Sequence, residues 1–297
     1  MSISNNNGRA LEARLVDIII QRNPSIQPLG STLNDQTRDL QHFNALSQLY
    51  QKEFSDFSNR YIQELSIHNI QSIERLKDTA AMQGDVTDIR LIYKDNTIRN
   101  ISLKHNHDAC KHQRPAALIK NQLGIQNQAL DQQYRQELDL IYRNFSSLVL
   151  PQDKDENGNY LFKLVKERNP KLIEKLYTDV YQLVKKYLLN HTDPQSVQTY
   201  FKFLVGNTDF EKVTLYANHR KIVIKDFSSI ADATKIIDAD ICPKTGYLTV
   251  KFDNNFILNM RIHTASSKFA LGRSLSLKFD SSVDMDNAPV PQRIITY

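Results

Sequence analysis

The stretch GDVTDIRLIYKDNTIRNISLKH, residues 84–105, decides the fold because its apolar and polar side chains alternate with a period of two. That period is typical of β-strands, and the turn-forming residues KDNT (94–97) separate two alternating runs. The stretch therefore predicts a β-hairpin. Such a hairpin holds the polar side chains of two neighbouring strands at fixed positions relative to one another.

The predicted register brings three polar side chains together. When the isoleucines and leucines of both strands pack on the core side, Asp88, Ser102 and Lys104 turn towards the other side. A carboxylate can hold a divalent cation, and a lysine can orient an attacking water or, as the neutral amine, deprotonate it, so this trio suits phosphodiester hydrolysis. The register favours Asp88 as the principal metal ligand. Asp85 remains the alternative, because a one-residue change in the turn would reverse the choice.

Apolar spacing predicts helices on both sides of the hairpin. An amphipathic helix is expected over residues 8–22, and a long helical stretch without proline over 37–82. Helix is expected again over 112–148, 168–190 and 194–204.

The chain becomes strand-rich beyond Gly206. The expected strands are KVTLYA, KIVIK, YLTVKF, FILNMRIH and SLSLKF. The pattern predicts an α/β (α+β) fold in which helices flank a mixed sheet. We expect a nuclease core with N-terminal helices and the catalytic hairpin over 1–150, a helical segment over 151–206, and a strand-rich DNA-recognition region over 207–297.

Composition limits the class of protein. The formal net charge of +5 and the pI near 9.0 are compatible with a polyanionic partner. The two cysteines, Cys110 and Cys242, form no CxxC pair, which argues against a thiolate zinc site and favours a reducing compartment. No run approaches the ~20 apolar residues of a membrane span, and the polar N-terminal residues lack a signal-peptide pattern. We expect a cytoplasmic location.

Two basic stretches are candidate DNA contacts. They are KHNHDACKHQR (104–114) and RIHTASSK (261–268), in which cations stand beside hydrogen-bonding side chains. The candidates are His105, Asn106, His107, Lys111, His112 and Arg114 in the first, and Arg261, His263, Thr264, Ser266, Ser267 and Lys268 in the second, with Arg273 and Arg293 beyond it. The first stretch suits phosphate binding and the second suits reading guanine in a groove. A solvated helix start and a polar surface turn are the alternative interpretations.

Several motifs together resemble one family of nucleases. They are NGRALE (7–12), GDVTDI (84–89), ISLKHNHDACKHQRP (101–115) and RIHTASSK with SLKFD (261–280). In these motifs the chain resembles the HaeIII-type restriction endonucleases, and its hairpin resembles the PD-(D/E)xK nuclease core, written here as Asp88 and Ser102-Leu103-Lys104. The resemblance implies a type II restriction endonuclease that cuts double-stranded DNA at a short palindrome with Mg²⁺. GGCC is the candidate sequence.

The chain departs from the superfamily pattern at one position. Ser102 stands where the superfamily usually has a metal-binding Glu or Asp. A second acid is therefore expected from elsewhere, and Glu12 on the first helix is the candidate because a helix glutamate beside the hairpin is a frequent superfamily feature. Asp108 is the runner-up, and the Leu103 carbonyl is expected to complete the metal ligands.

The resemblance and the symmetry of a palindrome also imply partners. A two-fold homodimer would place one site on each DNA strand. A cognate DNA methyltransferase is expected in the same system, although not as a stable partner. The alternatives are a non-catalytic DNA-binding protein and a PD-(D/E)xK enzyme that acts in DNA repair or on RNA.

Overall fold

The chain forms two compact units, each of which combines segments that are distant in sequence. The computed structural model describes residues 3–76, 85–106, 113–207, 209–283 and 290–297. Unit 1 comprises Met1–Asp108, Gly206–Ile230 and Val290–Tyr297, and unit 2 comprises Ala109–Val205 and Ala231–Pro289. These units differ from the three consecutive segments expected from the sequence, because segments far apart along the chain pair in one sheet.

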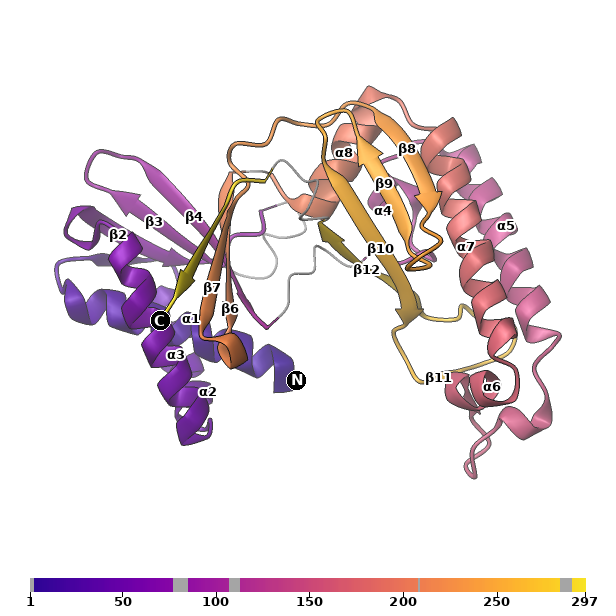
Figure 1. The fold of residues 1–297 in the computed structure, drawn as a ribbon, viewed down its shortest axis with the longest axis horizontal. Helices are drawn as coiled ribbons and strands as arrows, with labels where there is room; N and C mark the ends of the chain where they lie inside the picture. The colour runs from indigo at the N-terminus through magenta and orange to yellow at the C-terminus, as the bar shows by residue number, and fades with distance from the viewer. Residues whose placement is uncertain (1–2, 77–84, 107–112, 208, 284–289) are drawn as a thin grey trace. The chain divides into compact units, whose positions relative to one another are not determined.

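The described part of unit 1 contains a mixed seven-stranded sheet with the order β1-β2-β3-β4-β6-β7-β13 (Figure 1). Its strands are β1 (Gln27–Leu29), β2 (Ile70–Arg75), β3 (Ile89–Tyr93), β4 (Ile98–His105), β6 (Phe210–Tyr216), β7 (Lys221–Asp226) and β13 (Gln292–Thr296). The β1–β2 and β4–β6 pairs are parallel, and the other neighbours are antiparallel. The hairpin β3–β4 therefore occupies the centre of the sheet.

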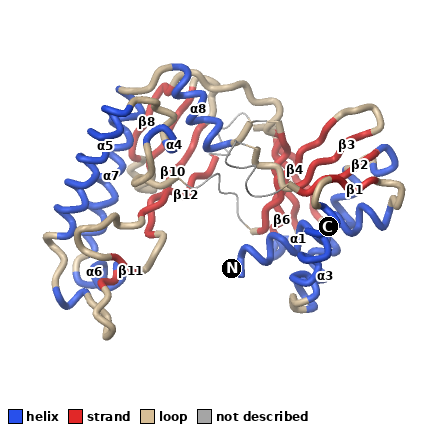
Figure 2. Tube along the Cα trace, turned by 180° about the vertical axis from the view of Figure 1, so that it is seen from behind, coloured by secondary structure: helices blue, strands red, loops and turns tan. Residues whose placement is uncertain are grey.

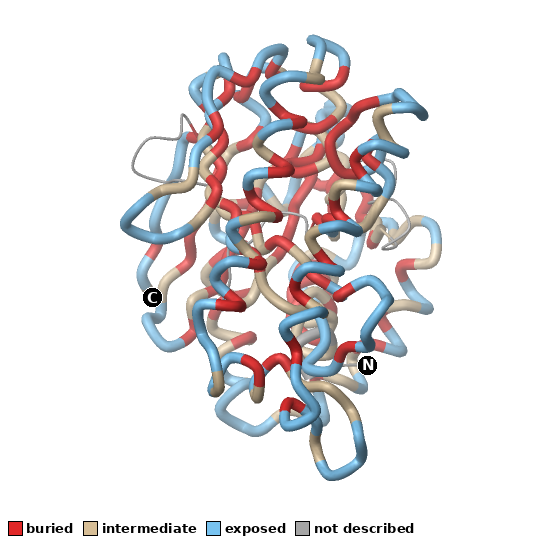
Figure 3. The backbone as a smooth tube through the Cα atoms, turned by 90° about the vertical axis from the view of Figure 1, so that its right-hand side faces the viewer, coloured by how far each residue is buried: buried red, intermediate tan, exposed pale blue. Residues whose placement is uncertain are grey.

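Helices α1 (Ile3–Arg22), α2 (Thr32–Asn44) and α3 (Gln48–Tyr61) pack with this sheet. Their apolar residues, such as Leu15 and Phe57, form one buried cluster with Ile73 of β2 and Ile101 of β4. Figure 3 shows the burial along the chain. The apolar face of each amphipathic helix thus covers the apolar face of the sheet. Short 3-10 turns lie at Ile62–Glu64, Ile67–Asn69 and Ala217–His219.

The prediction of one helical stretch over 37–82 is wrong in its described part. The chain leaves α2 at Asn44, begins α3 at Gln48 and then forms the strand β2 from Ile70. In this strand Ile70 and Ile73 are buried between neighbouring strands. Pairing with β1 and β3 outweighs the local helical spacing, since tertiary contacts override weak propensities. Residues 77–82 lie outside the described residues.

Other sequence predictions are confirmed. The first helix, the central hairpin and the helices near 168–190 and 194–204 are present, and all five predicted strands of the C-terminal part have counterparts. The helix expected over 112–148 is shorter in its described part, where α4 (Ile119–Gln122) and α5 (Gln128–Ser146) are the helices of residues 113–148. None of the described helices has the length and apolar character needed to cross a membrane.

The described part of unit 2 contains an antiparallel sheet with the order β12-β10-β9-β8. Its strands are β8 (Ile236–Ile241), β9 (Leu248–Phe252), β10 (Ile257–Thr264) and β12 (Leu277–Val283). The other elements are η4 (Pro151–Asp153), α6 (Phe162–Arg168), α7 (Pro170–Asn190), α8 (Pro194–Val205) and the small pair β5 (Tyr160–Leu161) and β11 (Lys268–Phe269). Figure 2 shows α7 beside this sheet, and the Tyr181 hydroxyl accepts a hydrogen bond from the backbone N–H of Ile262 at 2.7 Å.

Replacing a buried isoleucine of β4 tests this arrangement. Ile101 is fully buried, so Ile101→Ala should lower the free energy of unfolding by about 2–5 kcal/mol. Ile98 lies on the same strand but is 60% exposed, and Ile98→Ala should cost less than about 1 kcal/mol. Urea unfolding of both variants measures the difference. Equal losses would contradict the register of β4.

Candidate active site

The hairpin turn fixes which residues of β3 and β4 face each other. Asn96 adopts a left-handed conformation at φ 65°, and the backbone N–H of Tyr93 donates to the Thr97 carbonyl at 2.9 Å. The strands then pair from Ile92 with Ile98 to Ile89 with Ile101. Asparagine tolerates the left-handed region better than most residues, so the sequence favours this turn.

Asp88 lies immediately before β3, and its side chain forms hydrogen bonds with residues 102–104 of β4. Its Oδ2 accepts from the backbone N–H of Leu103 at 2.6 Å, from the Ser102 hydroxyl at 3.4 Å and from the Lys104 ammonium at 3.2 Å. The Asp88 and Lys104 side chains are 23% and 27% exposed, so both remain accessible to solvent. The structure therefore brings together the acid, the hydroxyl and the amine that the sequence singled out.

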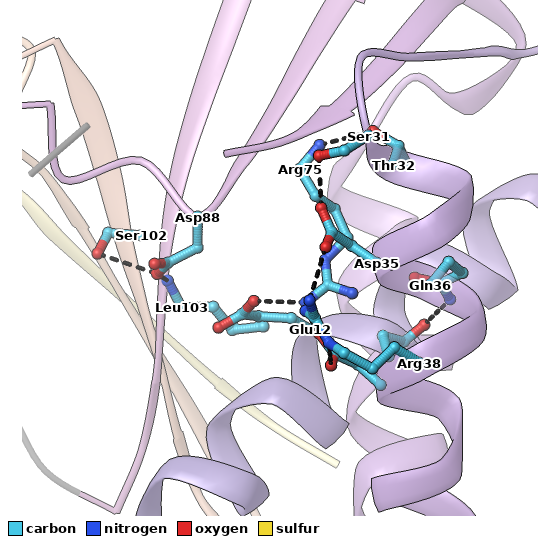
Figure 4. A network of polar contacts seen from close by, with 12 residues as sticks. Glu12, Ser31, Thr32, Asp35, Gln36, Arg38, Arg75, Asp88, Ser102 and Leu103 are labelled. Atoms are coloured by element: carbon cyan, nitrogen blue, oxygen red, sulfur yellow. Dashed lines mark hydrogen bonds and ion pairs between the residues drawn. The ribbon is translucent and has the colours of Figure 1, made fainter. Parts of the chain in front are cut away.

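Glu12 reaches the same place from helix α1. Figure 4 shows its carboxylate between Asp88 and Arg75, and Glu12 Oε2 accepts from Arg75 Nη2 at 2.8 Å. Burial and the negative charge of Asp88 raise the pKa of Glu12 to about 7, although Arg75 and Lys104 act in the opposite direction. The Asp88 carboxylate thus lies close enough to Glu12 to disfavour the ionised form of Glu12.

Asp85 is engaged elsewhere. Its Oδ2 pairs with Arg90 Nη2 at 2.9 Å, and its Oδ1 accepts from the backbone N–H of Thr87 at 3.0 Å. Arg90 in turn donates to the Asn100 side chain at 2.9 Å. The arrangement favours Asp88 over Asp85 as the acid beside Lys104.

The side chains here that could bind a metal ion are two carboxylates, Glu12 of α1 and Asp88 before β3. The described residues contain no group of three or more His, Cys, Asp or Glu side chains that could hold a metal. Backbone carbonyls and water are further oxygen ligands that Mg²⁺ usually takes. Leu103 contacts the site through its N–H, and the role expected for its carbonyl stays a prediction. Asp108 lies outside the described residues.

The described residues of the first basic stretch (104–114) lie in different parts of the structure. His105 packs against Tyr50 and Phe54 of α3, with ring centroids 5.9 and 5.0 Å apart, so it faces the helix layer, unlike Lys104. Asn106 accepts from the backbone N–H of Ala217 at 3.1 Å and contacts the His105 ring. Both residues thus make contacts within unit 1, and their expected DNA contact stays a prediction. His107, Lys111 and His112 lie outside the described residues, and Arg114 is exposed in unit 2.

The second basic stretch gathers around one carboxylate. Asp280 Oδ2 lies 3.1 Å from Arg261 Nη2 and 2.6 Å from His263 Nε2, and its Oδ1 lies 3.8 Å from Lys278 Nζ. The register explains the cluster, since β10 and β12 place Arg261 opposite Asp280 and His263 opposite Lys278. Arg261 is 53% exposed, so part of its guanidinium is accessible to a partner.

The remaining candidates are spread over both units. Ser266, Ser267 and Arg273 are exposed in unit 2, Thr264 ends β10, and the Lys268 ammonium lies 3.9 Å from Asp155. Arg293 belongs to unit 1 and pairs with Glu64 at 3.1 Å. The structure does not gather these residues into the Asp280 cluster.

Sequence reasoning missed three residues. Arg75 was missed because its segment was assigned to a helix, although the alternating residues IQSIER (70–75) contain a strand signal. Lys278 belongs to the predicted strand SLSLKF, and Asp280 follows that strand directly. Only the pairing of β10 with β12 connects them to Arg261.

Carboxylates beside a lysine on a mixed sheet are groups that suit a metal-dependent phosphodiester hydrolase. The family model of the HaeIII restriction endonuclease matches residues 14–231, and the chain belongs to this family. The protein is accordingly a restriction endonuclease, a type II site-specific deoxyribonuclease that binds DNA.

Two further comparisons add little. No curated protein matches the chain. Among solved structures, the chain is similar to the restriction endonuclease MspI in complex with its cognate DNA, at 14% sequence identity and a TM-score of 0.27. The match covers 82% of this chain and 83% of that chain. A likeness of this size supports no conclusion about the site.

The raised pKa of Glu12 predicts how stability depends on pH in metal-free protein. The folded state keeps the Glu12 proton up to about pH 7, whereas the unfolded state loses it near 4.5, so this contribution to stability falls as pH rises from 4.5 to 7. Glu12→Gln should therefore be the more stable protein at pH 8 in EDTA, by on the order of 1–3 kcal/mol, and lose this advantage below pH 5. Urea unfolding at both values measures it. The exposed Glu156→Gln is the control, and an equal pH profile for the two variants would contradict the assignment.

Proposed function

We propose that the protein makes Mg²⁺-dependent double-strand cuts in DNA at a short palindrome, with a PD-(D/E)xK type site built from Asp88, Glu12 and Lys104. The observation that carries the proposal is the 3.2 Å contact between Asp88 Oδ2 and Lys104 Nζ beside a second carboxylate. An acid and an amine on neighbouring strands belong to the PD-(D/E)xK pattern, a helix glutamate is a frequent feature of that superfamily, and family membership supports the activity.

The residues fit a divalent cation. The Asp88 charge raises the pKa of Glu12, and a cation between two carboxylates would remove that repulsion. Carboxylate oxygens are the ligands that Mg²⁺ prefers, so Asp88 and Glu12 would hold it together with the Leu103 carbonyl. Glu12 thereby supplies the acid that Ser102 cannot. When bound, Mg²⁺ would neutralise negative charge on the scissile phosphate.

The chain's own residues position the reacting groups. The Leu103 N–H and the Ser102 hydroxyl fix one oxygen of Asp88, so the acid is held in place before DNA binds. Lys104, paired with the same oxygen, orients the attacking water as an ammonium, or takes the proton of that water as a neutral amine.

The Asp280 cluster is the proposed reader of the DNA sequence. Arg261 and Lys278 can donate to guanine O6 and N7 in the major groove, which suits a GC-rich site such as GGCC. Asp280 limits the positions available to Arg261, and a side chain held in place loses less entropy on binding. Phosphate contacts from Arg114 and Lys268 would add affinity without sequence information.

A palindromic target favours a homodimer with one site for each DNA strand. In the host, a DNA methyltransferase of the same specificity would protect the genome without forming a stable complex with this protein. Two-fold symmetry also predicts that both strands of the target are cut at equivalent positions, which sequencing of the digested ends would show directly.

Digestion of plasmid DNA tests the proposal. With Mg²⁺ the protein should give discrete fragments that disappear in EDTA, and Lys104→Ala should reduce cleavage at least 1000-fold with DNA affinity changed less than about three-fold, because the ammonium acts on the water. Band shifts in Ca²⁺ measure the affinity. The exposed Lys94→Ala in the hairpin turn is the matched control and should cleave normally.

Three results would contradict this proposal. Absence of fragments from wild-type protein would indicate a non-catalytic DNA-binding protein. A smear or cleavage of RNA would indicate a nuclease without site specificity. Full cleavage by Lys104→Ala would remove Lys104 from the mechanism.

Replacing Arg261 tests the recognition surface. Arg261→Ala should weaken binding to the cognate sequence about 10- to 100-fold, the effect of losing one bidentate base contact, with a smaller effect on random DNA. Lys251→Ala is the matched control, because Lys251 lies on the neighbouring strand β9, is equally exposed and also pairs with an aspartate. Fluorescence anisotropy with both DNAs measures the ratio. Equal losses for the two variants would exclude Arg261 as a base reader.

A further inference from the structure

Arg75 connects Glu12 to the interior of unit 1. A single nitrogen, Nη2, donates to Glu12 Oε2 at 2.8 Å and to Asp39 Oδ2 at 2.9 Å. The Arg75 side chain is 4% exposed and the Asp39 side chain is fully buried, whereas Glu12 is 19% exposed at the site. The guanidinium therefore lies behind Glu12, on the side away from solvent.

The partners of Arg75 are themselves held. Asp39 accepts from Arg38 Nε at 2.6 Å and from Arg38 Nη2 at 2.8 Å, and Arg38 also pairs with Asp35 at 2.9 Å. The backbone N–H of Arg75 donates to the Thr32 hydroxyl at 2.9 Å. Both ends of the arginine are thus tied to helix α2, as Figure 4 shows, so the guanidinium has little freedom to move.

Protein stability does not account for this arrangement. Arg75 Nε and Nη1 are buried and have no hydrogen-bond partner among the described residues. Buried donors without a partner lower stability, and apolar residues of similar volume often replace a buried ionic triad without loss. A folded chain that needed only packing here would gain from leucine or methionine. The charge does, however, contact a carboxylate of the candidate site.

We infer that Arg75 is a positioning residue that holds the Glu12 carboxylate towards Asp88, with Asp39 as the buried anchor. This inference rests on the proposed role of Glu12 as a metal ligand. In this role Arg75 acts through Glu12: its hydrogen bond restricts the side-chain rotamers of Glu12, and a ligand held in its binding position loses less conformational entropy when a cation arrives. Helix α2 thereby contributes to the site through Asp39 although none of its residues reaches Asp88.

The double variant Arg75→Met/Asp39→Leu separates positioning from stability. It removes the buried charges together, so the folded protein should keep its urea unfolding midpoint or exceed it. Mn²⁺ serves as the probe, and the signal of free Mn²⁺ in electron paramagnetic resonance gives the Kd without DNA or catalysis. We expect the Kd to rise at least 10-fold, and the Mg²⁺ concentration for half-maximal cleavage to rise in parallel.

A second ion pair in the same sheet provides the matched control. Arg99 of β4 pairs with Glu211 of β6 at 2.6 Å, and neither residue belongs to the proposed metal site. Arg99→Met/Glu211→Leu should leave the Kd for Mn²⁺ within two-fold of wild type. A rise equal to that of the Arg75 double variant would overturn the inference, because it would show a general effect of removing charge from the sheet.

Two further variants make the outcome decisive. Arg75→Lys keeps the charge on a shorter side chain that does not match both carboxylates, and the Kd should rise at least three-fold even if the double variant does not fold. An unchanged Kd would overturn the inference. Glu12→Gln should raise the Kd at least as much as any Arg75 variant. If it does not, the proposed ligand role of Glu12 fails, whereas a normal Kd for the Arg75 variants alone refutes only the positioning.

Discussion

The antiparallel pairing of Ile89 with Ile101 is the constraint on which both the core and the candidate site depend. It buries both isoleucines in the cluster that the helices cover, and it leaves Asp88 beside the segment of β4 that contains Lys104. A shift of one residue would exchange the two faces of β4, so Lys104 would point into the apolar cluster and Leu103 away from it. Moving an ammonium group from water into the apolar core costs roughly several kcal/mol unless the group is paired with an opposite charge. The hydrophobic core therefore enforces the geometry of the polar site.

Local patterns predicted the parts of this arrangement that are local in sequence. The period of two identified β3 and β4, and the turn between them fixed the contact between Asp88 and Lys104. The strand β2 was missed, because its burial depends on pairing with β1 and β3 and leaves only a short alternating signal. The parallel pairing of β4 with β6 joins segments more than 100 residues apart, and nothing local indicates it. Consecutive domain boundaries could not follow from such a topology.

The same distinction applies to the site. Glu12 entered the prediction through a resemblance, since no local pattern places a helix residue beside a strand that begins 77 positions later. Asp280 and Arg75 were missed because each acts through partners brought close by tertiary pairing. The packing of His105 could not be predicted from its place in the basic stretch, and its DNA contact stays a prediction. Its position next to Lys104 suggested a shared role, but successive strand residues face opposite sides, and His105 packs against Phe54.

The substitution of a serine for the usual acid has a structural consequence in the proposed site. A carboxylate on β4 would be fixed by the sheet alone, whereas a carboxylate on α1 is in place only when that helix is docked against β4. Glu12 depends further on Arg75 and Asp39, which join β2 to α2. The site is therefore completed only when the helix layer and the sheet have packed together. Formation of the metal site is then part of the cooperative folding of unit 1, and weakening the helix layer would reduce metal affinity before it unfolds the sheet.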